Sequence, residues 1–89
     1  MPILVAGSLR IQTGLRDAFV ERSQSAIRLA RSHEDCLDFA VSPDVLDGNR
    51  VNIFEKWRSR AALEAFRNAG PEDDLFSLVE TFAVQEYEV

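Results

Sequence analysis

The chain has 89 residues, of which 46% are hydrophobic and 28% charged, and this length fits one domain over residues 1–89 with a small core. Its formal net charge of −5 argues against a nucleic-acid or anionic-membrane partner, because either would need a basic face. A single cysteine allows no internal disulfide and no apolar run is long enough to cross a bilayer, so we expect a cytoplasmic protein without a membrane span.

The first third of the chain predicts a strand followed by a helix. Residues 3–11 are apolar on both alternating faces and rich in β-branched side chains, which is typical of a strand buried on both sides. The pair Thr13-Gly14 then offers a helix N-cap, and Asp17 in the first turn suits the helix dipole. Over residues 15 to about 31 the apolar side chains recur with a helical period.

The middle of the chain predicts a β-hairpin. Residues 36–42 alternate between apolar and polar, as a strand does. Residues 43–49 are rich in Pro, Asp, Gly and Asn, which favour a turn. Residues 50–57 form a third predicted strand, and the short connection favours antiparallel pairing with the strand before it.

The last third predicts a second helix and a fourth strand. Ser59 is a suitable N-cap for the helix, and Gly70-Pro71 is expected to end it. Residues 72–78 are expected to form a loop with a short helical turn, and residues 80–89 alternate as a strand.

The order β-α-β-β-α-β with right-handed crossovers predicts a ferredoxin-like α+β fold, an antiparallel sheet with both helices on one face. The strands carry apolar residues on both alternating faces, so the face without helices needs another cover. A second copy of the chain is the simplest candidate, and we therefore expect a homodimer.

The predicted strand over residues 50–57 carries the most informative group of side chains. Val51, Ile53, Glu55 and Trp57 share one face, because alternate residues of a strand point the same way. This places a carboxylate beside the only tryptophan in apolar surroundings. Such a face is either the wall of an active site or a piece of core with one buried acid.

Three segments, in this order, resemble the antibiotic biosynthesis monooxygenase family of small dimeric α+β barrels, and the resemblance covers nearly the whole chain. They are an apolar opening strand that ends at a Gly-containing turn, the segment RSHEDCLDF (31–39), and FEKW (54–57) followed by AALEAF (61–66). The last segment resembles the family's Glu-x-Trp strand and the helix after it. Asp35 stands where the family usually has Gly, and the second helix lacks the His that haem-degrading members use as an iron ligand, so that branch is not expected.

The resemblance implies a cofactor-independent monooxygenase that oxidises a small aromatic substrate, such as a phenol, a quinol or an anthrone, with O2. A deprotonated substrate of this kind reduces oxygen directly, so the protein must hold the ligand, stabilise its anion and exclude water. Two alternatives stay open, because fold does not fix function. One is a non-enzymatic small-ligand-binding or interaction module on the same dimeric fold. The other is an isomerase-type member acting on a small polar metabolite, which predicts a pocket rich in charged groups.

Four residues are candidates for binding the substrate. Trp57 either stacks on the ligand or donates a hydrogen bond to it, or it is a core or interface tryptophan. Phe66 of the second helix is a further candidate, and Tyr87 of the last strand either donates to a phenolate or packs. Arg22 falls within the apolar stripe of the first helix, where it either binds a substrate anion or extends its charged end to water at the helix edge.

Glu55, Trp57 and His33 are the candidate catalytic residues. Glu55 acts as a base if burial raises its pKa, or it is a structural carboxylate paired with an arginine, for which Arg22 is available. His33 is the default proton acceptor, because its ordinary pKa lies near neutrality, or it is simply solvated. One His and one Cys do not make a ligand cluster, and no phosphate-binding glycine loop occurs, so we expect neither a metal nor a cofactor.

Overall fold

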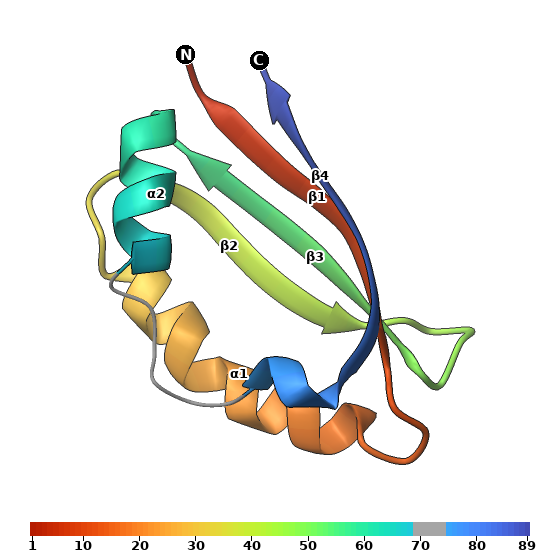
Figure 1. The fold of residues 1–89 in the computed structure, drawn as a ribbon. Coiled ribbons are helices and arrows are strands. Elements are labelled where there is room, and N and C mark those ends of the chain that lie inside the picture. Colours follow the sequence, from red (N-terminus) through yellow and green to blue (C-terminus); the bar gives the residue numbers. More distant parts are fainter. Residues whose placement is uncertain (69–74) are drawn as a thin grey trace.

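The structure is a computed structural model that describes residues 1–68 and 75–89. A four-stranded antiparallel sheet has the strand order β2-β3-β1-β4, and both helices lie against the same side of it (Figure 1). This confirms the predicted ferredoxin-like fold. The elements in chain order are β1 (Ile3–Ile11), α1 (Arg16–Arg31), β2 (Cys36–Pro43), β3 (Arg50–Trp57), α2 (Arg60–Asn68), the 3₁₀ helix η1 (Leu75–Leu78) and β4 (Val79–Glu88).

The core lies between the sheet and the helices. One buried cluster is centred on Trp57, Phe39 and Leu63, and a second on Phe19, Ile11 and Leu75. The partly buried residues Val41 and Val84 pack against both clusters, so the two are continuous. Neither of the two described α-helices has the length and apolar character needed to cross a bilayer.

The start of α1 differs from the prediction. The helix begins at Arg16, its N-cap residue is Leu15, and no side chain caps it, so the predicted cap at Thr13 is wrong. The reason is a tight turn before the helix: the Leu15 N–H donates to the Gln12 carbonyl at 3.0 Å, and Gly14 has a φ of 82°. Asp17 lies in the first turn, as predicted.

The remaining boundaries agree closely with the sequence patterns. Ser59 caps α2, since its Oγ accepts the Ala62 N–H at 3.2 Å. In the described part of the chain α2 reaches Asn68, and the predicted stop at Gly70-Pro71 lies outside the described residues. The short helical turn expected before the last strand is η1, and β4 begins and ends one residue earlier than predicted.

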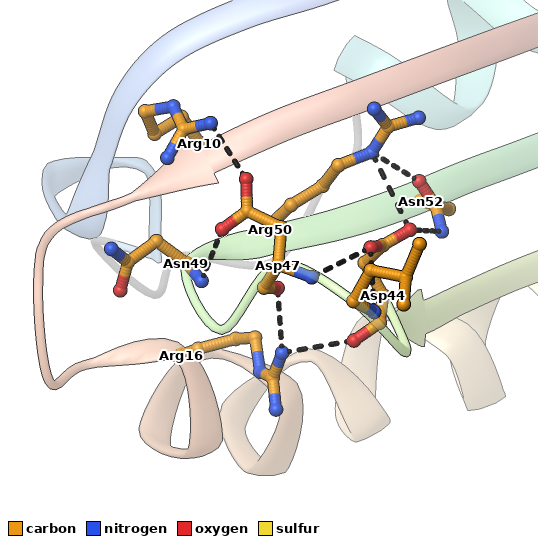
Figure 2. A network of polar contacts seen from close by, with 8 residues as sticks. Arg10, Arg16, Asp44, Asp47, Asn49, Arg50 and Asn52 are labelled. Atoms are coloured by element: carbon orange, nitrogen blue, oxygen red, sulfur yellow. Dashed lines mark hydrogen bonds and ion pairs between the residues drawn. The ribbon is translucent and has the colours of Figure 1, made fainter.

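The hairpin loop between β2 and β3 is fixed by a network of polar contacts (Figure 2). Arg16 reaches across from α1, and its Nη1 donates to the carbonyls of Asp44 at 3.1 Å and Asp47 at 2.9 Å. Asp47 also pairs with Arg10 of β1 at 2.8 Å. The Asp44 carboxylate accepts from Asn52 Nδ2 at 3.1 Å and from two loop backbone N–H groups. The loop is thereby tied to three other elements of the fold, β1, β3 and α1.

The tip of this anchored loop is aliphatic. Val45 and Leu46 are 95% and 94% exposed, although the backbone beneath them is held in place on both sides. The side chains that fix the loop are therefore all polar, and the two apolar ones contribute nothing to its packing.

Candidate functional site

A cavity of about 580 Å³ lies between the sheet and the helices. This volume is within the range of sites that hold small organic ligands, roughly 300–1,000 Å³. Most of its described wall is apolar and includes several aromatic rings. The sheet contributes Val5, Leu9, Phe39, Ile53 and Val84 among others, and the helices contribute Phe19, Ala26, Phe66 and Leu75.

The register of the sheet brings two carboxylates to this cavity in a single row. Val5 of β1 lies opposite Glu55 of β3 on one side and opposite Glu86 of β4 on the other. Directly opposed residues project to the same face of a sheet. Glu55 and Glu86 therefore both reach the cavity wall, with one strand between them.

Glu55 is a carboxyl group held in a largely apolar setting. Burial raises its pKa above the ordinary value, and the hydrogen bond from Trp57 and the positive charge of Arg67 oppose that rise only in part. The Trp57 Nε1–H donates to Oε1 of Glu55 at 2.9 Å. The carboxyl group is thus oriented by a fixed donor, and it binds a proton more readily than a solvated glutamate does.

Trp57 stands behind the cavity wall. It is 1% exposed and is not among the described residues that line the cavity. Its ring centroid lies 5.0 Å from that of Phe66 and 6.4 Å from that of Phe39, and both of these rings do line the cavity. Of the two interpretations of Trp57, the geometry corresponds to a core tryptophan whose N–H orients Glu55.

Two arginines of α2 converge on Glu86. The Nη1 of Arg60 donates to Oε1 at 2.7 Å, and the Nη1 of Arg67 donates to Oε2 at 2.8 Å. These two bonds lower the pKa of Glu86, so this carboxyl group stays ionised. They also join α2 to β4, and Arg67 lines the cavity together with Glu86 and Glu55.

The structure brings together only part of the predicted site. Glu55 and Phe66 line the cavity, whereas Arg22, His33 and Tyr87 are exposed and are absent from the described lining. His33 lies just after the end of α1, and its ring centroid is 6.0 Å from that of Phe66 in a T-shaped arrangement. Tyr87 alternates with Glu86 along β4 and so faces the side of the sheet without helices, where its hydroxyl donates to Gln85 at 2.9 Å.

The expected pairing of Glu55 with Arg22 is corrected by the geometry. The cation of the described residues that acts on Glu55 is Arg67. Arg22 was placed on the inward stripe of the first helix, but it is exposed, and the buried residues of α1 are Phe19, Ser23 and Ala30. Arg67 and Glu86 are not among the residues that the sequence predicted for the site. The alternation of Phe82, Val84 and Glu86 along the last strand was the signal that could have placed Glu86 toward the helices.

Metal ligands do not gather in the described parts of the chain. Within residues 1–68 and 75–89, no group of three or more His, Cys, Asp or Glu side chains is placed to hold an ion. Cys36, the single cysteine, is partly buried, and burial is the main reason that its thiol pKa is raised.

Known proteins share both the sequence pattern and this fold. The sequence model of the family described as antibiotic biosynthesis monooxygenase matches residues 2–77. The uncharacterized protein sll1783 of Synechocystis sp. is 35% identical over 63 residues, which span 71% of this chain but only 43% of that protein. The match thus leaves more than half of that relative without a counterpart here.

Solved structures of low sequence identity have the same fold. Rv0793 from Mycobacterium tuberculosis superposes with a TM-score of 0.84 at 22% identity, covering 100% of this chain and 95% of that one. PA3566 from Pseudomonas aeruginosa gives a TM-score of 0.80 at 19% identity, with 97% and 91% covered. Because the family match covers residues 2–77, most of the sequence, the chain belongs to the antibiotic biosynthesis monooxygenase family.

Proposed function

We propose that this domain binds a small aromatic hydroxyl compound or anthrone in the cavity and oxidises it with O2, with Glu55 as the proton acceptor. The observation that carries the proposal is a carboxyl group of raised pKa, oriented by a tryptophan N–H, in the wall of an apolar cavity. General bases work best when their pKa approaches the operating pH, and burial moves a glutamate in that direction.

The proposed reaction begins with proton transfer from the ligand to Glu55, which leaves the bonding electron pair on the ligand. The anion then gives one electron to O2, so that a ligand radical and superoxide form side by side. Their combination makes a carbon–oxygen bond, and the resulting peroxide takes its proton back from Glu55. Loss of water from the peroxide leaves a carbonyl group. The apolar wall favours this sequence, because it limits the contact of water with the charged intermediates.

The composition of the wall supports an aromatic ligand over a polar metabolite. Phe19, Phe39, Phe66 and Phe82 all contribute to it, and rings of this kind pack well against a flat ligand. Arg67 is the one arginine among the described lining residues. A site for a sugar phosphate needs several cationic donors, so the isomerase alternative has weaker support.

We also propose that a second copy of the chain covers the face of the sheet without helices. Leu4, Phe54 and Tyr87 lie on that face, and Phe54 and Tyr87 are 37% and 47% exposed. Light scattering at micromolar concentration tests this directly. We expect the mass of a homodimer, and a monomer at that concentration would contradict the proposal.

Oxygen uptake in an electrode, with a panel of hydroquinones and anthrones, tests the proposed reaction. Glu55→Gln is expected to lower kcat by roughly 10²-fold or more, the usual contribution of a positioned proton acceptor. Glu21→Gln makes the same chemical change on the exposed surface of α1 and is the matched control. Ligands that bind tightly without oxygen uptake would favour the alternative of a non-enzymatic binding module.

A further inference from the structure

The cavity contains a second charged group that the proposed reaction has not used. Arg67 lines the cavity beside Glu55 and Glu86, and its Nη1 is bonded to Oε2 of Glu86 at 2.8 Å. Its positive charge also acts on Glu55, where it lowers the pKa and so favours the ionised form. A single guanidinium group therefore lies within electrostatic reach of both carboxylates in the row that flanks Val5.

The charges around Arg67 balance only while Glu55 is ionised. Arg60 and Arg67 supply two positive charges, and Glu86 and Glu55 supply two negative ones. When Glu55 takes up a proton, two guanidinium groups share one carboxylate, and the cavity wall is left with an excess of positive charge. Glu64 and Glu88 also act on Arg60, Glu88 at 4.0 Å, but both side chains are exposed, so water screens their contributions.

We propose that Arg67 forms a subsite for the anionic oxygen of an aromatic hydroxyl ligand, and that Glu86 is the residue that positions Arg67 for this task. The subsite rests on the proposed function in one respect, that Glu55 receives the ligand's proton. The O–H bond of the ligand breaks, the proton goes to the Glu55 carboxylate, and the electron pair stays on the oxygen beside Arg67. The total charge of ligand and cavity stays the same throughout.

The shape of the guanidinium group explains why Glu86 matters. Arginine carries five N–H donors in one rigid plane, so a hydrogen bond at one of them restricts the directions of the others. The bond from Nη1 to Glu86 therefore limits the orientations of Arg67 at the cavity wall. Arg60 holds the other oxygen of Glu86 at 2.7 Å and keeps that carboxylate in place. A ligand without an ionisable oxygen gains nothing from this arrangement.

Binding of 4-nitrophenol tests the subsite without any turnover, because the phenolate and the phenol have different absorption spectra. Absorbance is titrated against pH with the probe saturated by protein, and 4-nitroanisole serves as a ligand of similar shape that cannot ionise. An opposite charge within about 4–6 Å shifts a pKa by roughly 1–3 units. Arg67 is half exposed, so the low end of that range applies. We therefore expect Arg67→Met to lower the acid dissociation constant of the bound probe by at least about tenfold.

Three further variants separate the charge of Arg67 from its place in the fold. Arg67→Lys keeps the charge and is expected to keep most of the phenolate signal. Glu86→Gln leaves Arg67 charged but less firmly held, so it is expected to weaken binding of 4-nitrophenol and to leave 4-nitroanisole unchanged. Arg58→Met is the control, because Arg58 pairs with Asp35 at 3.1 Å outside the cavity. We expect this variant to bind both ligands as the wild type does.

The proposal is overturned if 4-nitrophenol does not bind at millimolar concentration. It is also overturned if folded Arg67→Met, checked by circular dichroism, ionises the bound probe as readily as the wild type does. The oxygen electrode gives a separate answer. If the phenolate signal depends on Arg67 but no aromatic ligand causes oxygen uptake, the proposed subsite is supported and the proposed oxidation is contradicted.

Discussion

The indole N–H of Trp57 donates a 2.9 Å hydrogen bond to Oε1 of Glu55, two residues earlier on the same face of β3. The two side chains are neighbours because alternate residues of a strand project together. Trp57 is packed against Phe66 and Phe39, so its position is set by the core. That fixed indole in turn sets the direction of the carboxyl group. The bond uses Oε1, so Oε2 is the oxygen to which the proposed reaction assigns the proton.

The burial of Glu55 predicts a stability that depends on pH. Its folded-state pKa is raised above the unfolded value, mainly by burial, so the folded state is favoured while the group is protonated and loses this advantage as pH rises through the folded-state pKa. Glu55→Gln keeps an oxygen for the Trp57 N–H but carries no charge. At pH 8 we expect this variant to be more stable than the wild type by about 1 kcal/mol.

Urea unfolding at two pH values checks this expectation. At about pH 3, below the ordinary glutamate pKa, the difference between Glu55→Gln and the wild type should vanish. Glu21→Gln, the same chemical change on the exposed surface of α1, is the control. A Glu55→Gln variant that is less stable than the wild type at pH 8 would mean that the ionised carboxylate stabilises the fold.

Replacement of Trp57 tests the hydrogen bond itself. Trp57→Phe removes the N–H donor and leaves a gap in the core, and we expect a loss of about 2–4 kcal/mol in the free energy of unfolding. Part of this loss should disappear in the Glu55→Gln background, where the acceptor is uncharged. A double-mutant cycle measured by urea unfolding isolates that part, and a coupling near zero would show that the bond contributes no stability.

Gly7 lies in β1 at a place where the chain has no room for a side chain. Its φ is 148°, and a Cβ added there would overlap the carbonyl oxygen of Ala83 in β4. Gly7→Ala therefore has to push β1 and β4 apart, and we expect a loss of roughly 2 kcal/mol or more, measured by thermal unfolding. Gly48→Ala is the matched control, because a Cβ there meets open space, and its stability should change little.

The loop network predicts that the hairpin loosens in acid. Bonds from Asn52 and from the backbone N–H groups of Asp47 and Leu46 lower the pKa of Asp44 from 3.8 to about 2. A depressed carboxyl pKa gives stability that is present above the unfolded value and is lost as pH falls through the folded one. We expect the protection of the loop amides, relative to their intrinsic exchange rate at each pH, to fall as the pH drops between those two values. Asp44→Asn should exchange faster even at neutral pH, and an unchanged loop in that variant would contradict this role of Asp44.

Much of the fold follows from local patterns in the sequence. Alternation over residues 50–57 placed Glu55 and Trp57 on one inward face, and the cap at Ser59 marked the second helix. The error at Arg22 has a specific cause. A serine does not predict an inward position, yet Ser23 is buried, because its hydroxyl donates to the Val20 carbonyl at 2.8 Å and needs no water. The buried stripe of α1 therefore runs beside Arg22 and not through it.

The charged part of the site depends on contacts that no local pattern contains. Glu55 and Glu86 share a row because β1 lies between β3 and β4, and alternation along one strand does not reveal its neighbours. Arg67 joins this row because the last turn of α2 lies close enough for its side chain to reach Glu86 of β4, 19 residues along the chain. Periodicity gives the face of each element, whereas pairing and packing decide which faces meet.

In the β2–β3 loop, the residues that hold the backbone in place are different from the two residues that form the exposed tip. The backbone is held by Arg16, Asp44 and Asp47, and Val45 and Leu46 take no part in holding it. Exposed tips of this kind are where chains accept inserted segments without loss of structure. A peptide tag or a fluorophore inserted between Val45 and Leu46 would be attached to a backbone held by these polar contacts, at the end of the hairpin opposite Glu55. The domain thus offers a natural attachment point for labels that report on ligand entry without entering the cavity.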